Sequence, residues 1–564
     1  MSRMSGRTTG VATGLGAAVM LVAAALAVLL AAPTGAGAAA THGDPGTARG
    51  NPGWVATWAA SPQGGDTTAF TNQTVRNIMY TSVGGSAVRV RLSNTFGSGP
   101  VTVGATSVGV VLDGARLAPG TSHPVTFGGH SSVTIPAGQQ VLSDPVDMRV
   151  PRLTELAIDV YLPSPTGPAT YHAAAWQTNF VAPGDHAGQA AGAAYTKKTG
   201  SWYFADGVDV LNPATPGTVV AFGDSITDVG HSEVDSNARW PNYLSRRLDA
   251  ALGNRAPTVV DAGISGNRVL NDSSCYGQSA LARFRRDALS QSGAKAVVLL
   301  EGINDIGFSG EPDTGCYAPN DPTVTAAQIE AGYRRLITMA HARGIKIYAG
   351  TLTPFLGSNA TYGGNYGTAR GEALRRSVNH WIRTSHAFDG VVDFDRAVAS
   401  PYDPGYLNPA YNSTGCSACH TGDSLHPNDL GDQVMADAIP LTWFAHLRAQ
   451  ERDGATGGGL LGGELRLGLP FHGTGAAVED EQGTGVEAEA VEVAVELAQS
   501  LAERVAGALG ADLDLDGLAL DRVLAVGAGV GLADEDVDPA PPHSVLAIDA
   551  APIARAPAVH DPGE

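Results

Sequence analysis

Four short segments of the 564-residue chain contain the residue types that acyl transfer requires. They are Gly-Asp-Ser-Ile with Ser225, Gly-Ile-Ser-Gly-Asn with Gly266, Gly-Ile-Asn-Asp with Asn304, and Asp-Ser-Leu-His-Pro with Asp423 and His426. A serine hydroxyl is a weak nucleophile until a base, usually histidine, takes its proton, and a carboxylate must orient that base. We therefore predict Ser225 as the nucleophile, His426 as the general base and Asp423 as its orienting residue.

The oxyanion of a tetrahedral intermediate needs fixed hydrogen-bond donors. The predicted donors are the backbone N–H groups of Ser225 and Gly266 and the side-chain amide of Asn304. Each segment alone also has a structural explanation: Gly-Asp-Ser is a common turn, and His426 could simply precede a helix whose N-cap is Asn428. The occurrence of all four segments in one chain favours catalysis over these separate explanations.

Further polar residues lie directly beside these segments, namely Asp224, Thr227, Asp228 and Arg268. We expect them to hold the loops that carry the catalytic residues. The alternative is that they contact the substrate.

The elements that position these segments alternate between strands and helices. Apolar runs lie at 217–225, 258–265, 294–305, 344–352 and 390–395. Helical patterns lie near 240–252, 279–290, 325–343, 369–384 and 428–448. This alternation predicts a parallel sheet with helices on both faces, a three-layer α/β/α domain over residues 213–450. The chemistry of such sheets lies in the loops beyond the carboxyl ends of the strands, where the first three segments stand.

Residues 53–212 have a different pattern, with short runs of period two between clusters of Gly, Pro and Ser. In Ala-Val-Arg-Val-Arg-Leu-Ser-Asn, one face carries Val88, Val90 and Leu92 and the other carries Arg89 and Arg91. The run Leu-Ala-Ile-Asp-Val-Tyr-Leu at 156–162 alternates likewise. The pattern predicts an all-β, sandwich-like domain ahead of the α/β domain.

This β-rich region contains four tryptophans that could line a sugar-binding face: Trp54, Trp58, Trp176 and Trp202. Core or sheet-edge packing is the commoner role for such residues and is the alternative that we favour.

The first 40 residues resemble a secretory targeting segment. A short positive region precedes an apolar stretch at 11–32, and small residues at 38–40 offer an Ala-x-Ala cleavage site. We predict a signal peptide over 1–40 and a linker over 41–52. The alternative is an uncleaved anchor, since about 20 apolar residues can span a bilayer. The expected protein is secreted and extracellular, either free or associated with the cell surface, with no stable membrane insertion after cleavage.

The charge of the chain is concentrated at its end. Residues 451–564 hold 22 Asp and Glu against five Arg, a net charge of −17, whereas the whole chain carries −20. The rest therefore carries −3, and we expect no nucleic-acid partner. We predict a disordered, acidic, low-complexity tail over 451–564. The segment at 512–517 resembles the start of a calcium loop, but Val523 occupies the position of the required Glu, so no metal site is predicted.

The four cysteines allow three pairings in an oxidising compartment. We favour Cys275 with Cys316 and Cys416 with Cys419, because each pair then closes within its own loop. Cys416-x-x-Cys419 followed by His420 is also the attachment pattern of a c-type haem. A haem there would crowd the loop that carries the predicted base, so we favour the disulfide and expect no cofactor.

Residues 217–447 resemble the SGNH or GDSL hydrolase family. Ala-Phe-Gly-Asp-Ser-Ile-Thr-Asp matches its first block, and the segments with Gly266, Asn304 and His426 match its second, third and fifth blocks. The resemblance implies a three-layer α/β/α fold, a dyad or triad of Ser225, His426 and Asp423, and an oxyanion hole from Ser225, Gly266 and Asn304. The β-rich region is similar to the leading domain of some secreted bacterial members, whereas nothing in the family's pattern accounts for the acidic tail.

We therefore predict a secreted carboxylic-ester hydrolase, a GDSL-type esterase or lipase that forms an acyl-enzyme on Ser225. Its partner would be a small-molecule or polysaccharide ester. One alternative is a polysaccharide O-deacetylase similar to acetylxylan esterases. Alternatives of other classes are a surface carbohydrate-binding protein with a relic hydrolase domain and a haem protein for electron transfer.

Overall fold

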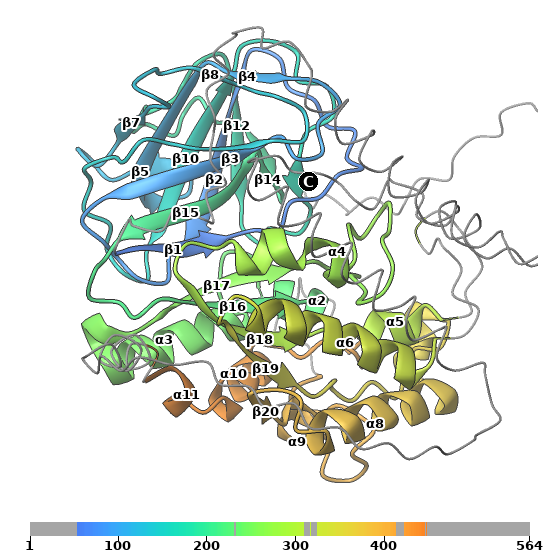
Figure 1. Ribbon diagram of the computed structural model, residues 1–564. Helices are drawn as coiled ribbons and strands as arrows, with labels where there is room; N and C mark the ends of the chain where they lie inside the picture. Colours follow the sequence, from blue (N-terminus) through green and yellow to red (C-terminus); the bar gives the residue numbers. More distant parts are fainter. Residues whose placement is uncertain are drawn as a thin grey trace, which may run out of the picture. The chain divides into compact units, whose positions relative to one another are not determined.

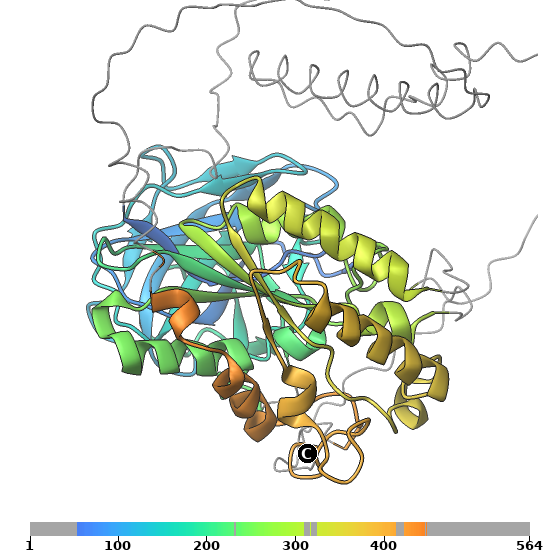
Figure 2. The ribbon, with the colours of Figure 1, turned by 60° about the horizontal axis from the view of Figure 1, so that its bottom comes forward.

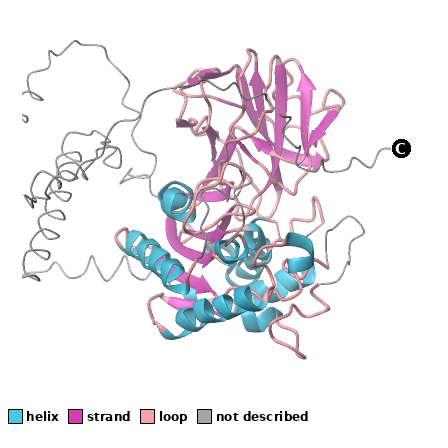
Figure 3. Cartoon of the chain, turned by 90° about the vertical axis from the view of Figure 1, so that its right-hand side faces the viewer, coloured by secondary structure: helices cyan, strands magenta, loops and turns pink. Residues whose placement is uncertain are grey.

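The structure is a computed structural model that describes residues 53–229, 233–309, 316, 324–412, 422–445 and 447. The predicted signal peptide, linker and acidic tail lie outside the described residues, as do Cys416, Cys419 and His420. Figure 3 shows a part rich in strands and a part rich in helices. The described residues of both parts belong to one compact unit.

The strand-rich part consists of antiparallel sheets (Figure 1). One sheet has the order β1-β15-β3-β9, formed by Trp54–Ala59, Ala205–Leu211, Val88–Ser93 and Gln140–Leu142. The larger has the order β13-β12-β2-β10-β5-β6, formed by Lys197–Thr199, Asn179–Pro183, Gln73–Tyr80, Glu155–Leu162, Ala105–Asp113 and Arg116–Leu117, and β7 (His123–Val125) pairs with β5. Two smaller pairs are β11 (Tyr171–His172) with β14 (Trp202–Tyr203), and β4 (Val101–Val103) with β8 (Val133–Ile135).

Period-two alternation positions the side chains of these strands. Val88, Val90 and Leu92 of β3 are fully buried in a core shared with the larger sheet. The opposite face of β3 is polar but is not left to solvent. Arg89 pairs with Asp209 at 2.8 Å, and Arg91 pairs with Asp206 at 2.7 Å.

Three of the four tryptophans of this region are core residues rather than parts of a sugar-binding face. Trp54, Trp58 and Trp202 are buried, and the rings of Trp58 and Trp202 pack edge to face with centroids 5.0 Å apart. The indole N–H of Trp202 donates to the carbonyl of Ile78 at 2.6 Å. Trp176 is half-buried with a positive φ of 48°. For these three buried tryptophans the packing alternative is confirmed.

The helix-rich part is built on one parallel sheet with the strand order β17-β16-β18-β19-β20. The strands are Thr258–Gly263, Thr218–Gly223, Ala294–Leu300, Lys346–Gly350 and Gly390–Val392. The central strands are almost continuously apolar, and Val219–Phe222 and Val297–Leu300 are buried. A sheet with both faces covered requires such runs.

Helices form a layer on each face of this sheet (Figure 2). On one side α3 (Trp240–Leu252) packs with α10 (Asp429–Ala438), which also contacts α9 (Phe394–Val398). On the other side α6 (Ala326–His341) packs with α8 (Ala369–Thr384) and with α4 (Ala280–Phe284), which continues as a π-helical turn, Arg285–Leu289. Shorter helices are α2 (Ser225–Asp228), α5 (Ile303–Gly307), α7 (Asn359–Tyr362) and α11 (Thr442–Ala445), with a 3₁₀ turn at Gly253–Arg255. The predicted fold class is confirmed: a parallel α/β domain follows an antiparallel β-rich region.

One predicted helix differs from the structure. The pattern at 428–448 predicts a single helix, but α10 ends at Ala438 and α11 begins at Thr442. Pro440 lies between them, and proline lacks the N–H that a continuing helix would need. The start agrees with the sequence, because the Asn428 side chain caps α10 by accepting from Gly431 N at 3.1 Å. Among the helices of the described residues, none has the length and apolarity that a membrane crossing requires.

Candidate active site

Ser225 is the first residue of α2, two residues after the end of β16 at Gly223. The Asp224 side chain caps this short helix by accepting from the N–H of Ile226 at 3.0 Å. A residue at the first turn of a helix has an N–H without an intrahelical partner. The strand-to-helix turn thus presents both the hydroxyl and the N–H of Ser225 at the carboxyl edge of the sheet.

His426 and Asp423 lie in the loop that precedes α10, about 200 residues further along the chain. The Nε2 atom of His426 is 2.8 Å from Ser225 Oγ, and its Nδ1 atom is 2.7 Å from Asp423 Oδ2. All three residues are buried. The Asp423 carboxylate can only accept a hydrogen bond, so the hydrogen of the neutral ring lies on Nδ1. The other ring nitrogen, Nε2, is then the acceptor for the serine proton. The structure therefore brings the three predicted residues together in the order that proton transfer needs.

The loop holds Asp423 by its own backbone. Asp423 Oδ1 accepts from the N–H of Leu425 at 2.9 Å and of His426 at 3.0 Å. Ser424, which lies between Asp423 and Leu425, has a positive φ of 61°, and this conformation closes the tight turn. These two backbone hydrogen bonds to Oδ1 orient the carboxylate so that Oδ2 faces the imidazole.

Tyr362 is a fourth member of this group that sequence reasoning missed. Its hydroxyl donates to Asp423 Oδ2 at 2.7 Å and lies 3.3 Å from His426 Nδ1. Burial and then the charge of Asp423 raise the pKa of Tyr362, so the hydroxyl remains a donor. Tyr362 ends α7 in a glycine-rich segment between two sheet strands, and no motif or spacing there marks it.

Gly266 occupies the third position of a turn from Ile264 to Asn267, closed by a 3.1 Å bond from Asn267 N to Ile264 O. Its φ is +77°, and a Cβ built there would lie 2.3 Å from the ring of Tyr276. The conformation and the close approach both require glycine. The turn follows β17, whose last residue pairs with the last residue of β16, so Gly266 and Ser225 lie at the same edge.

Asn304 is buried in α5, beyond the end of β18. Its Nδ2 atom donates to the carbonyl of Asn267 at 2.9 Å, and its Oδ1 atom accepts from the hydroxyl of Tyr366. These contacts fix the orientation of the amide and connect it to the turn that holds Gly266. The three predicted oxyanion donors therefore come from the ends of adjacent strands.

The residues beside the segments make loop-holding contacts. Asp228 accepts from both the N–H and the hydroxyl of Ser265, at 2.9 and 2.8 Å. Arg268 is buried and donates to the carbonyl of Asp272 at 2.7 Å, and Thr227 is fully buried. With Asp224 as the cap of α2, the contacts of Asp228 and Arg268 agree with the expectation that these residues support the loops, whereas the buried Thr227 hydroxyl makes no hydrogen bond to the described residues.

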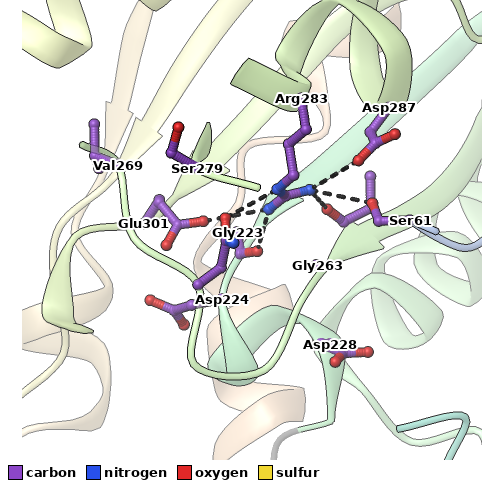
Figure 4. A network of polar contacts seen from close by, with 12 residues as sticks. Ser61, Gly223, Asp224, Asp228, Gly263, Val269, Ser279, Arg283, Asp287 and Glu301 are labelled. Carbon is purple, nitrogen blue, oxygen red and sulfur yellow. Dashed lines mark hydrogen bonds and ion pairs between the residues drawn. The ribbon is translucent and has the colours of Figure 1, made fainter. Parts of the chain in front are cut away.

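Behind the site, the buried guanidinium of Arg283 connects several loop segments (Figure 4). It donates to the carbonyl of Gly223 at 2.9 Å and lies 3.4 Å from Glu301 and 3.5 Å from Asp287. Burial raises the pKa of Asp224 to about 7, and nearby carboxylates add to this rise. Burial likewise raises the pKa of Glu301 well above its usual range. The Arg283 guanidinium thus lies among several acids next to the serine turn, and Arg286 also pairs with Asp287, at 2.6 Å.

The disulfide between Cys275 and Cys316 is present, which confirms that half of the predicted pairing. It lies next to Tyr276, the residue that packs against Gly266.

Within the described residues, no group of three or more His, Cys, Asp or Glu side chains could hold a metal ion.

The sequence of the α/β domain matches a known family of hydrolases, in agreement with the geometry of the site. Residues 221–434 match the GDSL-like Lipase/Acylhydrolase family. These residues therefore form a GDSL-like lipase/acylhydrolase (SGNH) domain, and the predicted resemblance is confirmed. By its family this domain is a hydrolase of the GDSL esterase type.

Solved structures similar to the chain include a GDSL-like lipase from Bacteroides thetaiotaomicron, with 18% identity, a TM-score of 0.27, and coverage of 43% of this chain and 89% of that one. A lipase/acylhydrolase from Enterococcus faecalis has 19% identity, a TM-score of 0.28, and coverage of 42% and 96%. A variant of an acetyl xylan esterase from Geobacillus stearothermophilus has 21% identity, a TM-score of 0.28, and coverage of 40% and 93%. Among curated proteins, none matches the chain.

Proposed function

We propose that the protein is a serine ester hydrolase that forms an acyl-enzyme on Ser225. The observation that carries this proposal is the hydrogen-bonded series from Ser225 Oγ to His426 Nε2 and from His426 Nδ1 to Asp423, with distances of 2.8 and 2.7 Å. Family membership independently supports ester hydrolysis. The same geometry disfavours a relic domain, because a protein without hydrolase activity has no use for a serine, a histidine and a carboxylate held at hydrogen-bond distance.

In the first half-reaction, Ser225 Oγ attacks the carbonyl carbon of the ester while His426 Nε2 takes the hydroxyl proton. The new C–O bond converts the carbonyl oxygen to an oxyanion. Collapse of this intermediate breaks the bond to the alcohol oxygen, which receives the proton from His426. Asp423 stays ionised throughout and stabilises the imidazolium that forms.

In the second half-reaction, water replaces the alcohol. His426 takes a proton from the water as its oxygen attacks the acyl carbon, and the resulting intermediate releases the acid and returns the proton to Ser225. No cofactor is needed for this proton balance.

The oxyanion is stabilised by the N–H groups of Ser225 and Gly266 and by the Asn304 amide. An amide nitrogen carries two hydrogens, and the bond from Asn304 to Asn267 uses one of them. The second hydrogen is the one that we assign to the oxyanion. Donors held rigidly in this way act without reorganisation at the moment of reaction.

The proposed substrate is a carboxylic ester, either of a small molecule or of a polysaccharide. We further propose that the protein is exported, on the basis of its apolar N-terminal segment. The buried positions of Trp54, Trp58 and Trp202 remove them as a candidate sugar-binding face, so a preference for polysaccharide would have to arise elsewhere.

The test is hydrolysis of p-nitrophenyl esters of rising chain length and of acetylated xylan by the wild type and Ser225→Ala. The matched control is Ser143→Ala. Ser143 lies in the β-rich region, is similarly buried, and accepts a hydrogen bond from Val90 N at 2.9 Å. We expect only Ser225→Ala to lose activity and to lose covalent labelling by a fluorophosphonate. Labelling or full activity in Ser225→Ala would disprove the assignment of the nucleophile.

A further inference from the structure

The β-rich region reaches the catalytic loops through a buried histidine. His172, at the end of β11, has its Nε2 atom 2.9 Å from Asp228 Oδ1 and its Nδ1 atom 2.9 Å from the carbonyl oxygen of Ser61. His172 and Asp228 are both buried. His172 and Ser61 belong to the β-rich region, whereas Asp228 ends α2, three residues after Ser225.

The partners of His172 determine its charge. A carboxylate and a backbone carbonyl can only accept hydrogen bonds, so both ring nitrogens must donate, and only the imidazolium carries both hydrogens. Burial lowers the pKa of His172, but the charge of Asp228 more than offsets this effect and leaves the pKa raised. Other charged groups near the ring include Arg239, which opposes the imidazolium, and Asp261, which favours it.

Asp228 connects His172 to the turn from Ile264 to Asn267 that carries Gly266, which we call the oxyanion turn. One of its oxygens faces His172, and the other accepts from the N–H and the hydroxyl of Ser265, the residue directly before Gly266. The carboxylate is therefore shared between the β-rich region and the turn. Without the hydrogen bond from His172, the Asp228 carboxylate would lose one of the contacts that fix its orientation toward Ser265.

The other side of the same turn is connected to the same part of the β-rich region. The hydroxyl of Ser61 accepts from Arg283 Nη1 at 3.1 Å, and Arg283 Nε donates to the side chain of Asn267 at 2.9 Å (Figure 4 shows Ser61 and Arg283). Asn267 directly follows Gly266, and its carbonyl accepts from Asn304. Ser61 therefore contacts both His172 and Arg283. His172 acts on Ser265 through Asp228, and Arg283 binds Asn267, so the two cations hold the residues on either side of Gly266.

We propose that His172 is a positioning residue that holds the Gly266 N–H in place through Asp228, so that the β-rich region supports the oxyanion hole from behind the turn. This inference rests on the proposed function for its effect on rate, although its effect on the turn does not. Oxyanion donors work because they are preorganised, and small displacements of positioned groups cost large factors in rate. The leading region is then part of the catalytic apparatus rather than a separate binding module.

The test compares His172→Ala and His172→Gln with Ser82→Ala in the full chain. Ser82 makes an equally buried contact between the same two parts, since its Oγ lies 2.8 Å from Ser245 Oγ and accepts from Val259 N at 2.8 Å. Val259 is near the start of β17, at the end of that strand away from Gly266. Ser82→Ala therefore removes an inter-region contact without reaching the oxyanion turn.

At a temperature where all variants are folded, we expect His172→Ala to lower kcat by about 10- to 100-fold with KM changed less than about twofold, as for an interaction that matters in the transition state. His172→Gln keeps a donor for Asp228 and should recover part of the rate. Ser82→Ala should lower the melting temperature and leave kcat unchanged. A wild-type kcat in His172→Ala, a loss confined to KM, or an equal kcat loss in Ser82→Ala would overturn the proposal.

Hydrogen–deuterium exchange gives a second measurement that does not depend on ester hydrolysis. Peptides that contain residues 264–267 should exchange faster in His172→Ala than in the wild type or in Ser82→Ala. Unchanged exchange in this turn would overturn the positioning role even if the enzyme is active. Faster exchange in a protein that hydrolyses no ester would support the positioning role and refute the proposed function instead.

Discussion

Replacement of Asn304 by alanine tests the oxyanion hole most directly. The side-chain amide is buried, donates to Asn267 O at 2.9 Å and accepts from Tyr366. Asn304→Ala removes the proposed oxyanion donor and, at the same time, the partner of two buried polar groups. Two effects must therefore be separated, one on the transition state and one on stability.

The two effects differ in the quantity that they change. Loss of one oxyanion donor lowers kcat by about 100- to 1,000-fold, or about 2.7–4 kcal/mol of transition-state stabilisation. A buried polar group that loses its partner costs about 1–3 kcal/mol of folding free energy. The substrate carbonyl gains most of its negative charge only in the transition state, so KM should change little and kcat/KM should fall with kcat.

The matched control is Asn379→Ala in α8. The Asn379 amide is also fully buried, accepts from Leu352 N at 2.7 Å and donates to Leu352 O at 2.8 Å. Both variants therefore lose a buried amide with two hydrogen bonds. Steady-state hydrolysis of a p-nitrophenyl ester, measured well below both melting temperatures, should show the kcat loss in Asn304→Ala alone.

Tyr366→Phe refines this comparison, because it keeps the amide and removes only the hydroxyl that contacts Asn304 Oδ1. Its kcat should lie between those of Asn304→Ala and the wild type. The reasoning is refuted if Asn304→Ala changes only KM, which would make Asn304 a ground-state binding residue, or if Asn379→Ala loses as much kcat.

Three further predictions concern other parts of the structure. Tyr362→Phe should lower kcat by up to about tenfold with little change in KM, because the hydroxyl helps to orient the carboxylate that holds the base; an unchanged or faster rate in steady-state assays would contradict this. Cys275→Ser with Cys316→Ser opens a loop with a sequence separation of 41 and should cost about 4 kcal/mol in denaturant unfolding, whereas an unchanged unfolding midpoint would contradict it. The pKa of His172 is raised in the folded state, so its contribution to stability is fully present below about pH 6.5 and is lost as pH rises through the folded pKa. The difference in unfolding free energy between the wild type and His172→Gln should therefore shrink from pH 6 toward alkaline pH, and a constant difference in urea titrations would count against the imidazolium.

Local sequence determined the elements and the edge at which the site lies. The apolar runs that end in Gly-Asp-Ser, Gly-Ile-Ser and Gly-Ile-Asn are strands whose carboxyl ends meet at one edge, because neighbouring parallel strands run in the same direction. The requirement for glycine at position 266 is also local, since its φ is positive within a four-residue turn. Pro440 shows that the same local rules, applied more strictly, would have divided the last helix.

Only the tertiary structure decided which distant residues meet these loops. Tyr362 ends the four-residue helix α7 and His172 ends the two-residue strand β11, elements too short to show a periodicity, so neither residue has a sequence signal that points to a partner. Arg89 and Arg91 follow an alternation that predicts a polar face but cannot say what covers it. In the fold, Arg91 contacts Gln291 beyond the π-helical turn at 3.3 Å.

The physical reason is the range of the forces involved. Periodicity, caps and turns depend on neighbours within a few residues, so the sequence alone predicted strands, helices and the order of the Ser225, Gly266, Asn304 and His426 segments. The contact between His172 and Asp228 forms only when β11 packs against α2, and it needs a buried partner from 56 residues away in the sequence. The catalytic groups could therefore be named from the sequence, whereas the residues that support them could be identified only in the folded chain.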